Sequence, residues 1–386
     1  MGWSARVVVG ITAAAIALAT VEGVSRLLVR SGARAYRFYR VTPLPMFWAD
    51  LDPNFGVWHP ANATFRHAED CWDVTYHSNS YGARDAERPR HSATRRRYVV
   101  LGDSFIEGYA IPDGERLTDR LNASPDEEFL NFGTSGAFGT VQELVLYRTL
   151  ASSFEHSDVL LFVLPMNDFS DNDPQYFARS RYRPYLLRTD RGYELQYTVR
   201  FDNRDTGVLA STMLAWNWLS DHVYLLDLLR QPVERRLHPQ VQPVYTSYTG
   251  HTDGELAIMA EAIRELGTAA EARRVHVFLI PVNDDLTRYQ HGERYALPGQ
   301  LRARLTSAIN VDVVDLLPDF IEYAGLHHEP TASFYLPCDA HWSALGNAVA
   351  ADTVARRLTP SSSTNQTSHR SPVPTYRRSA AELARR

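Results

Sequence analysis

The sequence lacks lysine altogether, and it has no large excess of charge of either sign. Its 40 basic residues are all arginine, and with 45 acidic residues they give a formal net charge of −5. A mildly acidic chain has no electrostatic footprint for nucleic acid, so we expect no nucleic-acid partner. The histidines outside the segments discussed below show no metal-ligand spacing, and we expect no metal or other cofactor. They include His156, His251, His327 and His328, which we expect on the surface or in loops.

Cysteine is also scarce, with only Cys71 and Cys338 in 386 residues. Two cysteines in a long chain are more often separate buried thiols than a disulfide. Export from the cytoplasm would favour a disulfide, and because Cys338 directly precedes Asp339, that bond would fix the segment against the N-terminal part of the chain. The sequence leaves both alternatives open.

A long uncharged apolar run stands near the N-terminus, at Val7–Val21. A spanning helix needs roughly 20 residues, so this run is short for one but long enough for the core of a signal peptide. If Glu22 lies near the interface, the run extends to Val29 and forms a membrane anchor. We therefore expect residues 1–30 to be an anchor or a signal segment that associates the protein with a membrane.

The orientation of this segment stays open. Arginines after the run outnumber the single Arg6 before it, which by the positive-inside rule keeps the body cytoplasmic. Ala17-Leu18-Ala19 fits a signal-peptide cleavage site. We expect a membrane-anchored protein whose body lies outside the cytoplasm, and the charges around the apolar run leave this orientation open.

The rest of the chain divides by composition. Residues 41–95 are rich in turn formers and aromatics and predict short strands with tight turns. Residues 170–250 are an insertion, with a hairpin around Asp190-Arg191-Gly192 followed by an amphipathic helix at 214–231. Residues 359–386 are polar and rich in serine and proline, which predicts a disordered tail.

Between residues 96 and 358, apolar runs alternate with helical patterns. Runs without clean polar alternation are typical of parallel strands covered on both faces, and the helical stretches include Gln142–Ser152, Glu255–Ala272 and Trp342–Leu358. The pattern predicts a three-layer α/β/α sandwich with a central parallel five-stranded sheet. The five predicted strands are Tyr98–Leu101, Phe129–Phe132, Val159–Leu164, Val275–Val282 and Val311–Leu317.

Polar or glycine-rich segments follow the first three predicted strands, and another opens the last helix. Ligands of open parallel sheets bind beyond the carboxyl ends of the strands, so these segments are expected to meet at one edge. They are Gly102-Asp103-Ser104, Asn131–Gly139, Pro165–Asn172 and Cys338–Asn347. Within them, we expect Asp103 to orient its loop and Asp168 and Asn172 to be turn residues.

In this order, the segments resemble the four blocks of the SGNH/GDSL hydrolase superfamily. Ser104 matches the serine of the GDS block and Gly136 the glycine after the second strand, while Asn167 matches the asparagine before an aspartate. His341 matches the histidine near the C-terminus. The resemblance covers residues 96–358 and implies a flavodoxin-like SGNH hydrolase fold.

The same residues suit nucleophilic catalysis. A serine hydroxyl needs an adjacent base that a third group orients, so we expect His341 to accept the proton of Ser104 and Asp339 to hold the other ring nitrogen. An oxyanion needs preorganised donors. The backbone N–H groups of Ser104 and Gly136 and the side-chain amide of Asn167 would supply three.

Two features depart from the family pattern. Many members have Asp-x-x-His, whereas this chain has Asp339-Ala340-His341, a spacing similar to that of a subset that includes members acting in exopolysaccharide acetylation. Met166 replaces the usual small residue before Asn167 and would narrow the pocket.

The resemblance implies a serine esterase that cleaves a small-molecule or glycan ester, either an O-acyl glycan or a lipid-like ester. Two alternatives stay open: an O-acyltransferase that uses the same three residues in surface polysaccharide modification, and a catalytically silent glycan-binding protein. The sequence does not indicate an oligomeric state.

Overall fold

The computed structural model describes residues 2–30, 46–69, 71–92, 95–177, 182–197, 223–225 and 248–359. Of the predicted helix at 214–231, only residues 223–225 are described. The predicted tail at 359–386 lies outside the described residues except for Thr359.

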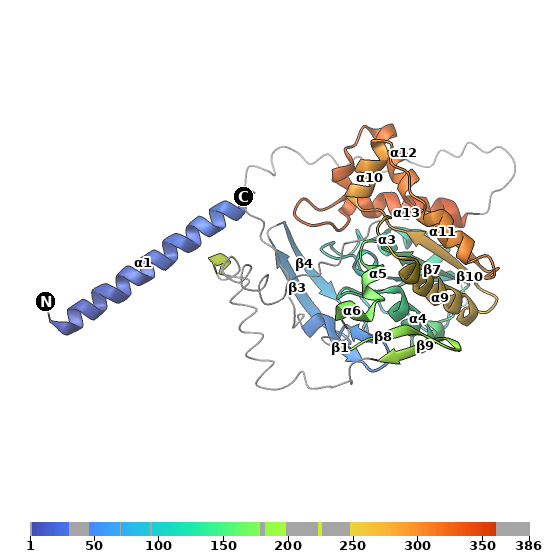
Figure 1. Cartoon of the computed structure of the whole chain (residues 1–386), viewed down its shortest axis with the longest axis horizontal. Helices are drawn as coiled ribbons and strands as arrows, with labels where there is room; N and C mark the ends of the chain where they lie inside the picture. Colours follow the sequence, from blue (N-terminus) through green and yellow to red (C-terminus); the bar gives the residue numbers. More distant parts are fainter. Residues whose placement is uncertain are drawn as a thin grey trace.

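A five-stranded, all-parallel sheet forms the centre of the protein (Figure 1). The strand order is β6-β5-β7-β10-β11, in which the first strand along the chain lies between the second and third. This is the 2-1-3-4-5 order of flavodoxin-like folds, and it confirms the predicted fold class. The strands are β5 (Arg96–Gly102), β6 (Glu127–Gly133), β7 (Asp158–Val163), β10 (Arg274–Leu279) and β11 (Val311–Asp315).

Helices cover both faces of this sheet. Crossovers between parallel strands are right-handed, so the reversal of strand order at β5 divides the helices into two groups. α3 packs against α13 in one group, and α4 packs against α9 in the other. These four helices are α3 (Leu117–Leu121), α4 (Thr140–Thr149), α9 (Asp253–Ala269) and α13 (Ala344–Leu358).

Local sequence explains the longest of these helices. Thr252 caps α9, because its hydroxyl accepts from the Glu255 N–H at 3.2 Å while Glu255 accepts from the Thr252 N–H at 2.7 Å. The buried face of α9 includes Leu256, Met259 and Ile263 at helical spacing. Further helices are α10 (Asn283–Gln290), α11 (Leu297–Arg304), α12 (Leu317–His327), α5 (Asp168–Asp171), α6 (Pro174–Phe177) and the 3₁₀ turns η2 (Ala151–Ser153) and η3 (Thr331–Phe334).

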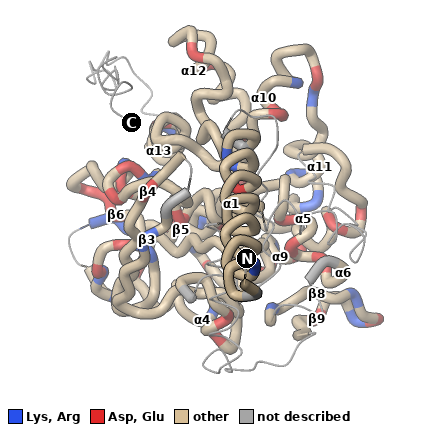
Figure 2. Tube along the Cα trace, turned by 90° about the vertical axis from the view of Figure 1, so that its left-hand side faces the viewer, with Lys and Arg blue, Asp and Glu red and all other residues tan. Residues whose placement is uncertain are grey.

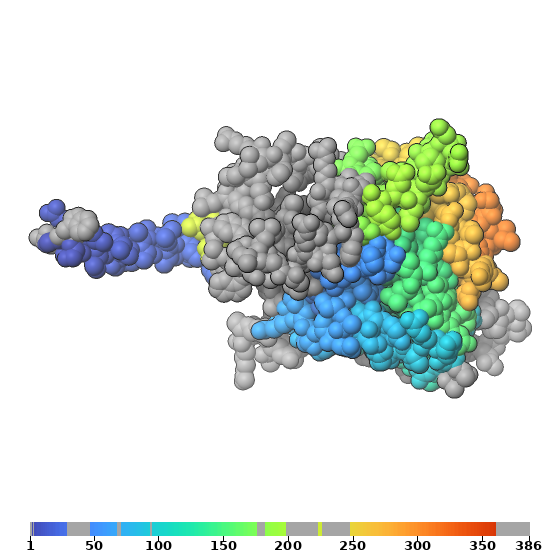
Figure 3. Space-filling view, turned by 90° about the horizontal axis from the view of Figure 1, so that it is seen from below, coloured from blue at the N-terminus to red at the C-terminus, as the bar shows by residue number. Residues whose placement is uncertain are grey.

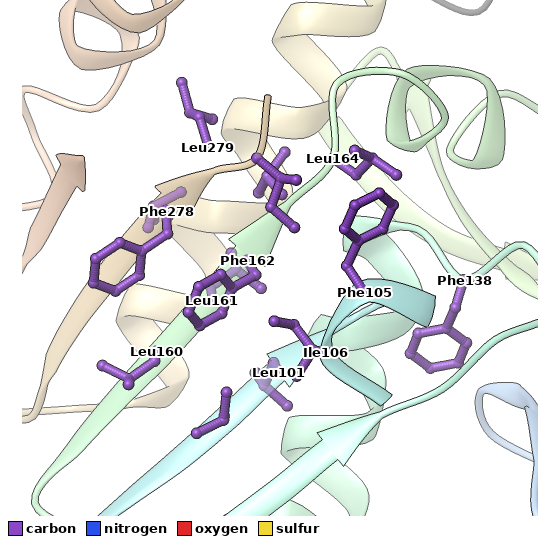
Figure 4. Packing of buried hydrophobic residues seen from close by; sticks show 14 of the residues in the cluster. Leu101, Phe105, Ile106, Phe138, Leu160, Leu161, Phe162, Leu164, Phe278 and Leu279 are labelled. Atoms are coloured by element: carbon purple, nitrogen blue, oxygen red, sulfur yellow. The ribbon is translucent and has the colours of Figure 1, made fainter. Parts of the chain in front are cut away.

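The core lies along the central strands. Leu160, Leu161 and Phe162 of β7 are fully buried, and the ring of Phe162 stacks on Phe278 of β10 at 4.9 Å (Figure 4). Every residue of β7 is buried, which explains why its sequence shows no polar alternation.

The N-terminal extension, residues 46–92, consists of short antiparallel pairs, as its turn-rich sequence predicts. β1 pairs with β2, and β3 forms a six-residue register with β4. A third hairpin, β8–β9, belongs to the insertion and turns at Asp190-Arg191. These elements are η1 (Met46–Trp48), β1 (Ala49–Asp52), β2 (Gly56–Trp58), β3 (Thr64–Glu69), β4 (Trp72–His77), β8 (Pro184–Thr189) and β9 (Gly192–Tyr197).

Helix α1 (Trp3–Arg30) extends away from the body of the protein (Figures 1 and 3). Its segment Ser4–Leu28, with a mean hydropathy of 2.1, contains an 18-residue window without a buried residue, and it is long and apolar enough to cross a membrane. The helix continues beyond Val21, where Glu22 pairs with Arg26 one turn later at 2.8 Å, a spacing that supports a helix. Figure 2 shows α1 almost free of charged residues, whereas both signs are interspersed over the body.

Candidate active site

Ser104 begins a short helix at the carboxyl end of β5. The helix, α2, runs over Ser104–Glu107, and its N-cap Asp103 accepts from the Phe105 N–H at 2.9 Å. Gly108 ends it in the left-handed conformation, with φ of 83°. The sequence predicts that Asp103 orients this loop, and its capping bond does so.

Ser104, His341 and Asp339 form a chain of hydrogen bonds. Nε2 of His341 lies 2.7 Å from Oγ of Ser104, and Nδ1 of His341 donates to Oδ1 of Asp339. The backbone N–H of His341 donates to the same oxygen at 2.9 Å. Because Asp339 fixes the proton on Nδ1, Nε2 is left as the acceptor for the serine hydroxyl.

The surroundings of His341 favour this arrangement. Burial opposes ionisation of Asp339, but hydrogen bonds and charge attraction from His341 outweigh it and lower the pKa of the carboxyl. The ring of Tyr109 stacks on His341 with a centroid separation of 4.3 Å, and Phe105 lies on it at 4.9 Å. The imidazole is therefore fixed by its neighbours as well as by Asp339.

Asn167 follows β7 and reaches the same edge of the sheet. Its Nδ2 donates to Oδ2 of Asp103 at 3.2 Å, which places the amide beside the residue that precedes Ser104. Asp103 is buried, and this burial raises the pKa of its carboxyl to about 6, although bonds from Phe105 and Asn167 oppose the shift. The neighbouring Asp168 is structural, as expected for a turn residue, since it accepts from the Leu164 N–H at 2.9 Å.

Gly136 lies in the loop between β6 and α4, with φ of 101°. That value is in the left-handed region, which glycine adopts without strain. Because β6 pairs directly with β5, this loop and Ser104 emerge from neighbouring strands. The four predicted blocks thus meet at the carboxyl edge of one sheet.

A disulfide joins Cys71 to Cys338, which lie 267 positions apart in the chain, with 6.2 Å between their Cα atoms. The sequence leaves open two separate thiols or a disulfide, and the structure has the disulfide. Cys71 lies in the turn between β3 and β4, and Cys338 adjoins Asp339. The bond therefore connects the N-terminal extension to the segment that carries Asp339 and His341.

Sequence reasoning missed several buried charged residues around the site. Glu107 and Glu143 are both fully buried; the only signal for each was a charged residue among apolar neighbours in the sequence. His156, for which the sequence predicts a surface or loop position, is buried instead, with Nε2 at 3.0 Å from the Tyr147 hydroxyl. Across the described ranges, no group of three or more His, Cys, Asp or Glu side chains could hold a metal ion.

The sheet has flavodoxin-like strand order, and the four blocks lie at one edge of it, as the resemblance of the sequence implies. The fold is a three-layer α/β/α sandwich. Some solved structures resemble it over about two thirds of the chain. They include a member of the lipolytic protein G-D-S-L family from Veillonella parvula, with 14% identity, 69% of this chain and 99% of that chain covered, and a TM-score of 0.36.

A lipase/acylhydrolase from Enterococcus faecalis is similar at 13% identity, with 69% and 98% of the two chains covered and a TM-score of 0.35. A two-domain esterase active on acetylated mannans is similar at 10% identity, with 68% and 48% covered and a TM-score of 0.36. No protein-family model matches the chain, and no curated protein matches it. The candidate site is therefore described from its own geometry, above all from the contact between Ser104 and His341.

Proposed function

We propose that the protein is a serine esterase that acts through an acyl-enzyme on Ser104. The observation that carries this proposal is the hydrogen-bonded chain Ser104–His341–Asp339, in which the histidine nitrogen that faces the serine is free to accept a proton. A serine hydroxyl becomes nucleophilic when an oriented base removes its proton.

In the proposed reaction, Oγ of Ser104 attacks the ester carbonyl carbon while Nε2 of His341 takes the hydroxyl proton. The tetrahedral intermediate collapses, the carbon–oxygen bond to the alcohol breaks, and His341 returns its proton to that oxygen. Water then attacks the acyl-enzyme with His341 as base, which releases the carboxylic acid and restores Ser104.

Three donors are proposed for the oxyanion: the backbone N–H groups of Ser104 and Gly136 and Nδ2 of Asn167. The amide nitrogen of Asn167 carries two hydrogens, of which one goes to Asp103. The bond to Asp103 fixes the amide plane, so the second hydrogen has a defined direction. Such preorganisation is what makes oxyanion donors effective.

The proposed substrate class is an O-acyl glycan or a lipid-like ester. A panel of acetyl- and longer acyl-esters, offered to the full chain in detergent, tests the esterase activity. We expect hydrolysis that Ser104→Ala abolishes; hydrolysis that persists in that variant would overturn the assignment. Addition of an oligosaccharide acceptor to an acetyl-ester donor separates hydrolysis from acyl transfer, because a transferase would give acetylated acceptor in place of acetate.

We further propose that α1 anchors the protein with its body outside the cytoplasm. Disulfides persist in oxidising compartments, so the Cys71–Cys338 bond supports a body outside the cytoplasm. The arginines that follow the apolar run favour the opposite orientation by the positive-inside rule. A membrane-impermeant protease added to intact cells that express the full chain should digest the body. Protection until the cells are opened would contradict the proposed orientation.

A further inference from the structure

Glu107 lies on the same turn of helix as Ser104. α2 begins at Ser104 and ends at Glu107, so the two side chains are three residues apart on one short element. Ser104 is partly exposed, whereas Glu107 has no exposed surface. A fully buried carboxylate next to a proposed nucleophile requires compensating partners.

The two carboxylate oxygens of Glu107 bind two separate parts of the chain. Oε1 accepts from Trp48 Nε1 at 2.9 Å and lies 3.2 Å from His59 Nε2, both in the N-terminal extension. Oε2 accepts from the Ser135 N–H at 2.6 Å and from the Ser135 hydroxyl. Ser135 directly precedes Gly136, so Glu107 holds the backbone next to the proposed oxyanion donor.

The donors around Glu107 require a carboxylate at this position. One oxygen faces the indole N–H of Trp48 and the other the backbone N–H of Ser135, and neither of these groups can accept a hydrogen bond. A glutamine would place its NH₂ against one of the two. Although burial opposes ionisation, His59, Arg84 and Ser135 together lower the pKa of Glu107 to about 2, so the side chain is ionised.

The loop that carries Gly136 also lies directly against α2. A Cβ atom at Gly133 would come within 2.3 Å of the Glu107 backbone nitrogen, so only glycine allows this approach. The Thr134 N–H donates to the Gly102 carbonyl at 3.3 Å, and the Thr134 hydroxyl lies 3.3 Å from His59 Nε2. Residues 133–135 are thus fixed to the strand end and helix that present Ser104.

We propose that Glu107 is a positioning residue that aims the Gly136 N–H at the oxyanion, and that Trp48 and His59 of the N-terminal extension hold Glu107 in place. The inference rests on the proposed esterase function. It makes the N-terminal extension part of the catalytic machinery, because removal of its two side chains would leave one oxygen of a buried carboxylate without its described partners.

The test compares Glu107→Gln with the parent enzyme after titration of active sites with a fluorophosphonate. Oxyanion donors act mainly in the transition state, so kcat per titrated site should fall about 10²- to 10³-fold while KM stays within about twofold. Trp48→Phe, which removes one donor and keeps Ser135 in place, should lower kcat about fivefold. If Glu107→Gln does not fold, Trp48→Phe alone tests the proposal.

Tyr98→Phe is the matched control, because it removes a hydrogen bond of 3.0 Å to Glu127 at the opposite end of β5. Its kcat per titrated site should equal that of the parent. If the role of a residue is merely structural, its substitution should reduce the number of titrated sites and leave kcat per site unchanged. That result for both Glu107→Gln and Trp48→Phe would overturn the proposal.

Amide hydrogen exchange gives a second readout that does not depend on activity. Exchange in residues 133–139 should be at least about tenfold faster in the variants, with residues 158–163 of β7 unchanged. If the parent enzyme is neither labelled nor active, the esterase proposal fails, and exchange still decides whether Glu107 holds the loop. Unchanged exchange in residues 133–139 would contradict that role.

Discussion

Nε2 of His341 lies 2.7 Å from Oγ of Ser104, although the two residues are 237 positions apart in the chain. The segment that presents His341 is held on several sides. The Leu336 N–H donates to the His341 carbonyl at 2.9 Å, and Cys338 is bonded to Cys71. The catalytic geometry therefore depends on how firmly this segment is attached to the rest of the protein.

Asp339→Asn should lower kcat by roughly three to four orders of magnitude, because the amide no longer fixes the proton on Nδ1 or stabilises the imidazolium. The measurement is kcat per fluorophosphonate-titrated site. Asp284→Asn is the control, since Asp284 follows another strand at the same edge but pairs with Arg288 at 2.9 Å. Equal activity of the two variants would remove Asp339 from the mechanism.

Asn167→Ala should lower kcat about 10²- to 10³-fold with little change in KM, because it removes a proposed oxyanion donor. Asn172→Ala offers a contrast within the same loop. Asn172 accepts from the Val141 N–H at 3.0 Å, so its loss should lower the melting temperature and leave kcat per titrated site unchanged. A stability loss without a kcat effect in both variants would contradict the role of Asn167.

Reduction of the disulfide should destabilise the protein by about 2–5 kcal/mol, because the bond constrains the unfolded chain. Urea unfolding with and without a phosphine reductant measures the difference. The Cys71→Ser/Cys338→Ser double variant should have the same free energy of unfolding as the reduced protein, and the reductant should not change it. Two reactive thiols in denatured, unreduced parent protein would show that the bond is absent in solution.

Glu143→Gln should stabilise the protein at pH 8 and not at pH 4. Glu143 is fully buried, and within the described part of the chain its carboxylate oxygens have no hydrogen-bond partner. Burial, together with the negative charges of Asp103 and Asp171, raises the pKa of Glu143 well above its ordinary value of 4.5.

The unfolded chain therefore releases this proton first as the pH rises. The contribution of Glu143 to the free energy of unfolding is complete below pH 4.5 and declines above it, at a limiting slope of about 1.4 kcal/mol per pH unit. Glu128→Gln is the control, because Glu128 accepts from Arg97 at 2.6 Å and from Arg88 at 3.0 Å. It should destabilise at pH 8, and a loss of stability in Glu143→Gln at that pH would contradict the account.

The strand pattern and the blocks around Ser104 could be predicted because both are local. A parallel strand buried on both faces is an apolar run, and a strand end with glycine and polar residues lies in one short stretch of sequence. Boundaries shift by a few residues: the helix predicted at Gln142–Ser152 spans Thr140–Thr149, and the last strand ends at Asp315. A helix or strand ends where its backbone hydrogen bonds end, and the pattern of apolar residues does not show that position.

The contacts that cross the fold could not be predicted in this way. The Cys71–Cys338 bond depends on a Cα separation that only the folded chain has. Glu107 looks like an ordinary surface charge until Trp48 and Ser135 are placed around it. Such partners are tens of residues away in sequence, and no periodicity connects them.

The most direct test of the central claim is to map the adduct of a fluorophosphonate on the folded, full-length protein by mass spectrometry. The account predicts a single modified residue, Ser104, and loss of that adduct in His341→Ala, since the base that activates the hydroxyl is then absent. An adduct on another residue, or an unmodified Ser104 in folded protein, would contradict the proposed mechanism.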